Sequence, residues 1–214
     1  MNDQLAMDDQ LLTWTHQARQ RLADDLGGLT AADWRSPSLC SGWDVEHVVA
    51  HLTAAASTNQ LAWLRSIILS GFRPAVHNER RLREHLGKDP AETLARFRAV
   101  IASSVAPSKD LAAYLGEVLV HGEDIRHPLG IPSVVDVGAV TQVAEFYASR
   151  NFAVNSKSLA AGLHLRATDG TFEHGNGPEV AGPTLGLVMA MAGRPSHLDQ
   201  LAGDGIPVLA SRLG

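Results

Sequence analysis

Glu117 and His121 lie four residues apart in a segment that favours helix, so both side chains share one helical face. Apolar residues occupy the same face, which directs the carboxylate and the imidazole toward the interior of the fold. His51 lies in the same way within an earlier apolar segment, between Val48 and Leu52. An inward carboxylate needs a cationic partner, a proton or a metal. One metal shared by His51, Glu117 and His121 would satisfy all three groups.

Two imidazoles and one carboxylate are typical of a catalytic zinc site, in which three protein ligands leave a fourth position for water or substrate. Nickel, iron or manganese would also accept this set of ligands. The spacing of Glu117 and His121 alone predicts a metal only weakly, because helices often carry such pairs on a solvated surface or as an ion pair. The open alternative is a trio without metal, in which Glu117 pairs with a histidinium.

Three further polar residues lie close to this set in the sequence. Asp124 follows His121 by about one helical turn, and Arg126 comes soon after it. Either one is placed to orient a ligand or to bind an anionic substrate. His47 precedes His51 by four residues, which offers an alternative site with two histidines. We expect His47 instead to lie at the rim, as the polar group nearest the mouth of the site and a contact for a bound cofactor.

Apolar periodicity and capping signals predict the helices that must position these residues. The stretch Ser41-Gly42-Trp43-Asp44 suits a capping box before a helix that carries His51 and runs to about residue 70. Pro128 should end the helix that carries Glu117 near His127, because proline disfavours helical geometry in the residue before it. The other expected helices span about residues 8–26, 90–104, 109–126 and 136–147.

The sequence changes character beyond about Asn155, where glycine and proline crowd residues 175–183. A loosely alternating segment, a hairpin turn, a helix and a final apolar segment are expected at about residues 159–167, 169–170, 184–192 and 206–213. We therefore expect a mostly α protein with two domains. These are a helical bundle over residues 1–154 and a small α/β domain over residues 155–214.

Composition argues against several classes of function. The net charge is −5, and the 18 basic residues are scattered, which gives no electrostatic footprint for nucleic acid. No leader-like N-terminus and no apolar run long enough to span a membrane are present in the sequence. A single cysteine cannot form an internal disulfide. We expect a cytoplasmic monomer or homodimer whose partners are small molecules.

Cys40 lies just before the helix of His51, where a helix N-terminus favours a thiolate. It is therefore a candidate nucleophile or fourth metal ligand, although the simpler interpretation is a small packed residue. The tryptophans are interpreted as packing residues. They are Trp14, Trp34, Trp43 and Trp63.

Two stretches carry longer motifs: residues 42–52 are GWDVEHVVAHL, and residues 117–130 are EVLVHGEDIRHPLG. They resemble the G-W-[ST]-V-x-D-V-x-A-H-L and E-x-x-x-H-G-x-D-I-R-x-P-L-G signatures of the mycothiol-dependent maleylpyruvate isomerase family, within the DinB/YfiT-like metalloenzyme superfamily. The resemblance implies that His51, Glu117 and His121 are zinc ligands. His47 stands where the family has aspartate.

The resemblance also implies a DinB-like helical bundle followed by a small α/β domain that resembles sterol-carrier-protein modules. The C-terminal domain is short, and its Gly193-Arg194 resembles a family helix ending from which the arginine reaches the cleft between domains. There Arg194, and with less support Arg126, would hold a substrate carboxylate by a bidentate contact. A helix C-terminal cation and a surface ion pair are the alternatives for these two arginines.

The implied chemistry uses a thiol, because a metal dication deprotonates a thiol that is mostly protonated at neutral pH. In the family reaction, the thiolate of mycothiol adds to the double bond of an acid such as maleylpyruvate. The new single bond rotates, and elimination gives the trans isomer and returns the thiol. The same centre suits an S-transferase acting on a small acidic or electrophilic substrate. The rivals are a DinB-like hydrolase, a transferase using another thiol, and a non-enzymatic binding module that a metal only braces.

Overall fold

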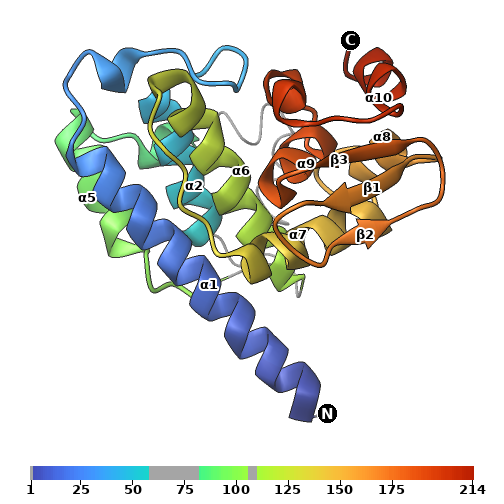
Figure 1. The fold of residues 1–214 in the computed structure, drawn as a ribbon. Coiled ribbons are helices and arrows are strands. Elements are labelled where there is room, and N and C mark those ends of the chain that lie inside the picture. Colours follow the sequence, from blue (N-terminus) through green and yellow to red (C-terminus); the bar gives the residue numbers. More distant parts are fainter. Residues whose placement is uncertain (1, 58–81, 106–109) are drawn as a thin grey trace, which may run out of the picture. The chain divides into compact units, whose positions relative to one another are not determined.

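The computed structural model describes residues 2–57, 82–105 and 110–214. The chain divides into two compact units, Met1–Ser133 and Val134–Gly214. Helices dominate both units, and a three-stranded sheet lies near the C-terminus (Figure 1). The prediction of a mostly helical protein with a small C-terminal sheet is confirmed. Across the described ranges, every helix is too short or too polar to cross a membrane.

The first unit is a bundle of helices that pack along one another (Figure 1). Its described helices are α1 (Asn2–Gly27), α2 (Val45–Ser57), α5 (Pro90–Ala99) and α6 (Leu111–Leu129), with a short 3₁₀ turn, η1 (Asp33–Arg35), before α2. Both α1 and α2 contact α5 and α6. The shared core includes the fully buried Leu22, Val48, Phe97 and Leu115. This packing sets α2 beside α6, the two helices that carry the predicted ligands.

Helix α1 begins at Asn2, which is earlier than the expected start near residue 8. Its periodic apolar residues Leu11, Leu22 and Leu26 are buried, as the spacing predicts. Most side chains of the described first turns are exposed, with Leu5 and Met7 among them. The apolar pattern therefore located the packed part of α1 and missed its exposed beginning.

Helix α2 is capped by Asp44, whose Oδ1 accepts the backbone N–H of His47 at 2.9 Å. The expected capping box starting at Ser41 is therefore wrong, because the helix begins only at Val45. Asp44 is an N-cap in its own right, since its short carboxylate reaches an N–H group of the first turn. The expected continuation to residue 70 and Trp63 lie outside the described residues.

Helix α5 begins as predicted, with Pro90 in its first turn and the Asp89 carboxylate accepting the backbone N–H of Glu92 at 2.9 Å. It ends at Ala99, earlier than the expected residue 104. Beyond its end the buried Arg19 guanidinium donates to the carbonyls of Val100, Ile101 and Ser103. Burial lowers the pKa of Arg19 to about 10. The Arg19 side chain of α1 thus binds carbonyls that would accept backbone N–H groups if α5 were longer.

Helix α6 runs through Pro128 to Leu129, so the expected end near His127 is wrong. Gly130 ends the helix in the left-handed conformation, with φ of 65°. Pro128 has no N–H group to donate to the carbonyl of Asp124, four residues earlier. That carbonyl instead accepts the backbone N–H of Leu39 at 3.0 Å. The expected start of this helix at residue 109 lies outside the described residues.

The second unit contains α7 (Val137–Ser149), α8 (Ser156–Ala160), α9 (Thr184–Met191), the 3₁₀ turn η2 (Pro195–Gln200) and α10 (Ile206–Leu213). Its sheet has the order β2-β1-β3, formed by β2 (Glu173–His174), β1 (His164–Ala167) and β3 (Glu179–Gly182). Strand β1 is antiparallel to β2 and parallel to β3. Helix α9 lies where the sequence predicts a helix, and the final apolar segment forms α10, which the sequence pattern did not assign to a helix.

Helix α7 starts after Asp136, which caps it by accepting the backbone N–H of Ala139 at 3.0 Å. The sequence pattern predicts that this helix belongs to a bundle over residues 1–154. In the structure it groups with the second unit, because it packs against α9. Division of the chain into folding domains at residues 154 and 155 stays a prediction.

Candidate metal centre

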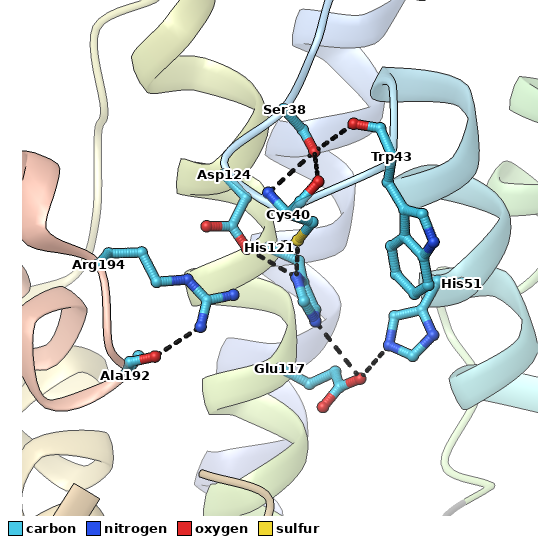
Figure 2. Close-up of polar contacts among 9 residues, drawn as sticks. All are labelled: Ser38, Cys40, Trp43, His51, Glu117, His121, Asp124, Ala192 and Arg194. Carbon is cyan, nitrogen blue, oxygen red and sulfur yellow. Dashed lines mark hydrogen bonds and ion pairs between the residues drawn. The ribbon is translucent and has the colours of Figure 1, made fainter. Parts of the chain in front are cut away.

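Ligand atoms from α2 and α6 converge at one point in the first unit (Figure 2). The Nε2 atom of His51 lies 2.7 Å from Oε1 of Glu117, and the Nε2 atom of His121 lies 3.8 Å from the same oxygen. The two imidazole rings are nearly perpendicular, with centroids 5.0 Å apart. All three side chains offer a ligand atom within 4.8 Å of the others. The structure thus brings together the trio proposed from sequence, whose role as metal ligands stays a prediction.

The three side chains are shielded without being sealed from solvent. The side chains of His51 and His121 are 14% and 15% exposed, and that of Glu117 is 27% exposed. Buried residues such as Val48, Leu52 and Val118 flank them on their helices. Each ligand position is therefore held by packing on one side and is reachable from the other, which a site that binds a substrate requires.

The arrangement fits a divalent cation. Zinc holds nitrogen and oxygen ligands at about 2.0–2.2 Å, so ligand atoms on one ion lie roughly 3–4 Å apart. The distances of Glu117 Oε1 to the two imidazole nitrogens, 2.7 and 3.8 Å, fall on either side of this range. Small side-chain rotations would centre an ion among His51, Glu117 and His121. The donor chemistry is that of a zinc site with three protein ligands.

Asp124 hydrogen-bonds to His121 at Nδ1, the ring nitrogen that does not face Glu117. Its Oδ2 accepts the Nδ1–H group of His121 at 2.8 Å, and its side chain is fully buried. A proton held on Nδ1 leaves the lone pair of a neutral imidazole on Nε2, the atom that faces Glu117. This is the arrangement in which a carboxylate orients a metal-binding histidine. The role of Asp124 in orienting a metal ligand stays a prediction, and this hydrogen bond is its support.

Cys40 lies against the same pair. Its thiol donates to Asp124 Oδ2 at 3.0 Å, and its sulfur is 3.4 Å from Nδ1 of His121 (Figure 2). Cys40, His121 and Asp124 form a second group with metal-ligand chemistry. The sequence alone leaves Cys40 open as a nucleophile, a metal ligand or a packed residue, and it predicts no hydrogen bond for the thiol. Its position two residues before the first signature, which begins at Gly42, is the signal that could have linked it to the site.

Trp43 packs against the other histidine. Its ring centroid is 5.1 Å from that of His51, with the ring planes tilted by 47° (Figure 2). The interpretation of Trp43 as a packing residue agrees with this contact. His47 belongs to the same sequence motif but is not part of the ligand trio. Its Nδ1 pairs instead with Asp44 Oδ1 at 2.5 Å. The His47 side chain is 34% exposed, and a contact with a bound cofactor stays a prediction.

Arg126 is directed to a different part of the bundle. Its Nε donates to Asp25 of α1 at 2.7 Å, and its side chain is 7% exposed. Glu123 lies 3.9 Å from Nη1 of the same guanidinium. A Cβ atom at Gly122 would lie 2.7 Å from that Nη1, so the glycine of the motif makes room for the arginine. These contacts give a substrate-binding role for Arg126 no support.

Arg194 belongs to the second unit. It follows α9, and its Nη1 donates to the backbone carbonyl of Ala192 at 2.6 Å. Gly193, between them, has φ of 87°, a conformation that favours glycine. The Gly193-Arg194 turn of the predicted motif is therefore present, while binding of a substrate carboxylate by Arg194 stays a prediction.

Comparisons with known proteins give a family-model match to part of the chain and a similarity of fold. Residues 15–112 match the family model of the mycothiol maleylpyruvate isomerase N-terminal domain. The segment contains His51, whereas Glu117 and His121 lie just beyond it. Two crystal structures of the mycothiol-dependent maleylpyruvate isomerase, one of them a histidine-to-alanine mutant, resemble this fold with TM-scores of 0.61. They are 19% and 18% identical to this chain, and each match covers 92% of both chains. No curated protein matches the chain by sequence.

Proposed function

We propose that the chain, whose residues 15–112 match the family model of the mycothiol maleylpyruvate isomerase N-terminal domain, is a metal-dependent enzyme of this type. It would use a divalent cation, zinc first, to activate a small-molecule thiol for reaction with an electrophilic acid. The residues proposed to hold the cation are His51, Glu117 and His121. Mycothiol is the proposed thiol, and an isomerase or an S-transferase is the proposed reaction class.

The observation that carries the proposal is the convergence of three ligand atoms within 4.8 Å, with an oriented histidine among them. Sequence spacing alone does not bring His51 to Glu117, because the two residues lie on different helices. A chance cluster of polar side chains would not be expected to include a buried carboxylate that hydrogen-bonds to Nδ1 of His121. Asp124 supplies that carboxylate at 2.8 Å.

Each side chain has a separate task in this account. Asp124 keeps the proton of His121 on Nδ1 and so leaves Nε2 able to bind. Glu117 contributes the negative charge of the ligand set, and the Trp43 ring restrains the imidazole of His51. A cation bound by these ligands would lower the pKa of a thiol at its open position and so supply thiolate at neutral pH.

The proposed reaction is a reversible addition and elimination. The thiolate sulfur, whose proton has already left to solvent, bonds to one carbon of a cis double bond, and the electron pair of that bond moves into the adjoining carbonyl as an enolate. Rotation about the resulting single bond and expulsion of the sulfur restore the double bond in the trans form. No atom is gained or lost, and the thiol is returned. We propose that Arg194 binds the substrate carboxylate through its guanidinium.

The proposal includes a finer assignment of the fold. The first unit would be a DinB-like metal-binding bundle, since its described helices present ligands from α2 and α6. The second unit would be a small α/β domain similar to sterol-carrier-protein modules, a proposal supported by its three-stranded sheet and short helices.

Metal analysis followed by an activity assay tests the proposed function. Protein purified without added metal should contain about one divalent metal ion per chain and should isomerise maleylpyruvate only when mycothiol is present. His51→Ala should lose both the metal and the activity. His164→Ala is the matched control, because His164 pairs with Glu173 on the sheet of the second unit. Metal-free wild-type protein would favour the alternative in which Glu117 pairs with a histidinium.

The same assay separates the rival functions. Activity with another thiol and not with mycothiol would identify a related transferase. Hydrolysis without any thiol would identify a DinB-like hydrolase. Bound metal without thiol binding would indicate a module that the metal only braces. Each of these results would contradict the dependence on mycothiol that we propose.

A further inference from the structure

We propose that Cys40 is a positioning residue for His121, acting through Asp124, and that it is not a metal ligand. The inference rests on the proposed function, because it concerns the binding of a cation by His121. It assigns a role to a side chain that the proposed chemistry leaves unused. Its basis is a chain of hydrogen bonds on the side of the imidazole that faces away from Glu117.

Asp124 Oδ2 accepts two hydrogen bonds at once. One comes from Nδ1 of His121 at 2.8 Å and the other from the Cys40 thiol at 3.0 Å. Because the Asp124 side chain is fully buried, the orientation of its carboxylate depends on protein donors. The thiol therefore helps to fix the oxygen to which His121 donates. Loss of that donor should weaken the restraint on this oxygen and so loosen the imidazole.

The loop that carries Cys40 is fixed to the same residue through the backbone. Leu39 N–H donates to the carbonyl of Asp124 at 3.0 Å. That carbonyl is open to the loop because Pro128, four residues later in α6, has no N–H group. The carbonyl and the side chain of Asp124 thus bind consecutive residues of one loop, which fixes the distance between the Cys40 thiol and Oδ2.

The loop is also ordered internally. Ser38 Oγ donates to the carbonyl of Trp43 at 2.8 Å and accepts the backbone N–H of Cys40 at 3.1 Å (Figure 2). Trp43 N–H donates back to the carbonyl of Cys40 at 3.0 Å. Gly42 adopts φ of 80° within this turn. These hydrogen bonds hold the backbone of Cys40 in place, so the position of its thiol is restrained by the loop.

Cys40 and Glu117 lie at different ring nitrogens of His121, so the thiol is not on the side that a cation bound with Glu117 would occupy. The Cys40 sulfur lies 3.4 Å from Nδ1, whereas Glu117 approaches Nε2 at 3.8 Å. The N–H bond at Nδ1 and the lone pair at Nε2 point in divergent directions, so an ion bound at Nε2 would lie out of reach of a group at Nδ1. A thiol donor in this place strengthens the orientation of the ligand without entering the coordination shell.

A matched pair of variants tests the proposal with Co²⁺ as the probe. Cys40→Ser and Cys40→Ala both remove the sulfur, but only serine keeps an O–H donor. We expect Cys40→Ala to lower Co²⁺ affinity about tenfold, the low end of the effect of removing an outer-shell partner, and Cys40→Ser to stay close to wild type. The wild-type Co²⁺ spectrum should lack a sulfur-to-cobalt charge-transfer band. Equal affinities of the two variants would indicate simple packing, and such a band would make Cys40 a ligand; either result overturns the proposal.

A measurement on the metal-free chain separates this proposal from the proposed function. Nitrogen-15 NMR reports whether the Nδ1 proton of His121 is held or exchanges with water. We expect a slowly exchanging proton in wild type and in Cys40→Ser, and a broadened or lost signal in Cys40→Ala. If wild type does not bind Co²⁺, the metal function fails while this test still applies. An unchanged signal in Cys40→Ala would overturn the positioning role even if the metal binds.

Discussion

Asp124→Asn changes one charge behind His121 while nearly preserving the shape of the side chain. In the native chain the carboxylate accepts from His121 at 2.8 Å and from Cys40 at 3.0 Å. A carboxamide oxygen could still accept a hydrogen bond but would no longer offer a full negative charge. The variant therefore tests whether the charge of Asp124 supports the ligand strength of His121.

The expected effect follows from the hydrogen bond to His121. A bond to a charged group contributes about 1.5–3 kcal/mol and a neutral one about 0.5–1.5 kcal/mol. The difference of roughly 1–1.5 kcal/mol corresponds to about a tenfold change in affinity. This lies at the low end of the range of about 10-fold to 100-fold that outer-shell partners show. Asp124→Ala removes the acceptor entirely and should lie toward the upper end.

Competition against a fluorescent zinc chelator at fixed pH measures the affinity, with circular dichroism as a check on folding. Asp25→Asn is the matched control, because it weakens the ion pair with Arg126 in the same unit and does not contact His121. We expect the control to lose stability and keep its zinc affinity. Equal zinc affinities for Asp124→Asn and wild type would refute the role of Asp124 as an orienting group.

Three other predictions address the loop, the acid stability and the second unit. Pro128→Ala restores an N–H group that competes for the carbonyl of Asp124, so hydrogen exchange at the Leu39 amide should become faster, as mass spectrometry would show. Hydrogen bonds to the Glu92 carboxylate lower its pKa, the larger effect coming from the backbone N–H of Lys88 and the smaller from the guanidinium of Arg96. At Glu92 the folded chain thus binds fewer protons than the unfolded chain. The ionised carboxylate therefore stabilises the fold above the unfolded-state pKa of 4.5, and this stabilisation is lost as the pH falls through the lower pKa of the folded state. Glu92→Gln should therefore lose less stability than wild type between neutral pH and about pH 3 in urea titrations. Arg194→Gln should raise KM for an anionic substrate by about 10-fold to 100-fold, the effect of losing a hydrogen bond to a charged group of about 1.5–3 kcal/mol, and an unchanged KM would remove Arg194 from the substrate site.

The sequence predicted the parts of the site that depend on local periodicity. The spacing of Glu117 and His121 on a helical face was enough to expect both side chains on one side of α6. The apolar neighbours of His51 likewise indicated its inward direction. Long-range convergence followed from the family signatures and not from spacing, because no local rule fixes the distance between α2 and α6.

Features that depend on tertiary contacts were not predicted. Helix α6 continues through Pro128 because Gly130 ends it and because a loop binds the carbonyl that the proline leaves open. Arg126 turns toward α1, where Asp25 is its partner across a long sequence separation. The hydrogen bond of Cys40 to Asp124 has the same origin. In each case a polar group found a partner in another element, which single-sequence patterns do not record.

X-ray absorption at the metal edge of protein purified without added metal tests the central claim most directly. The account predicts a divalent ion with nitrogen and oxygen ligands at about 2.0–2.2 Å, two of them imidazoles, and no sulfur from the protein. His51→Ala should lose the ion or one imidazole. A sulfur ligand at about 2.3 Å in the thiol-free protein, or an absorption spectrum without an imidazole contribution, would contradict a centre built from His51, Glu117 and His121.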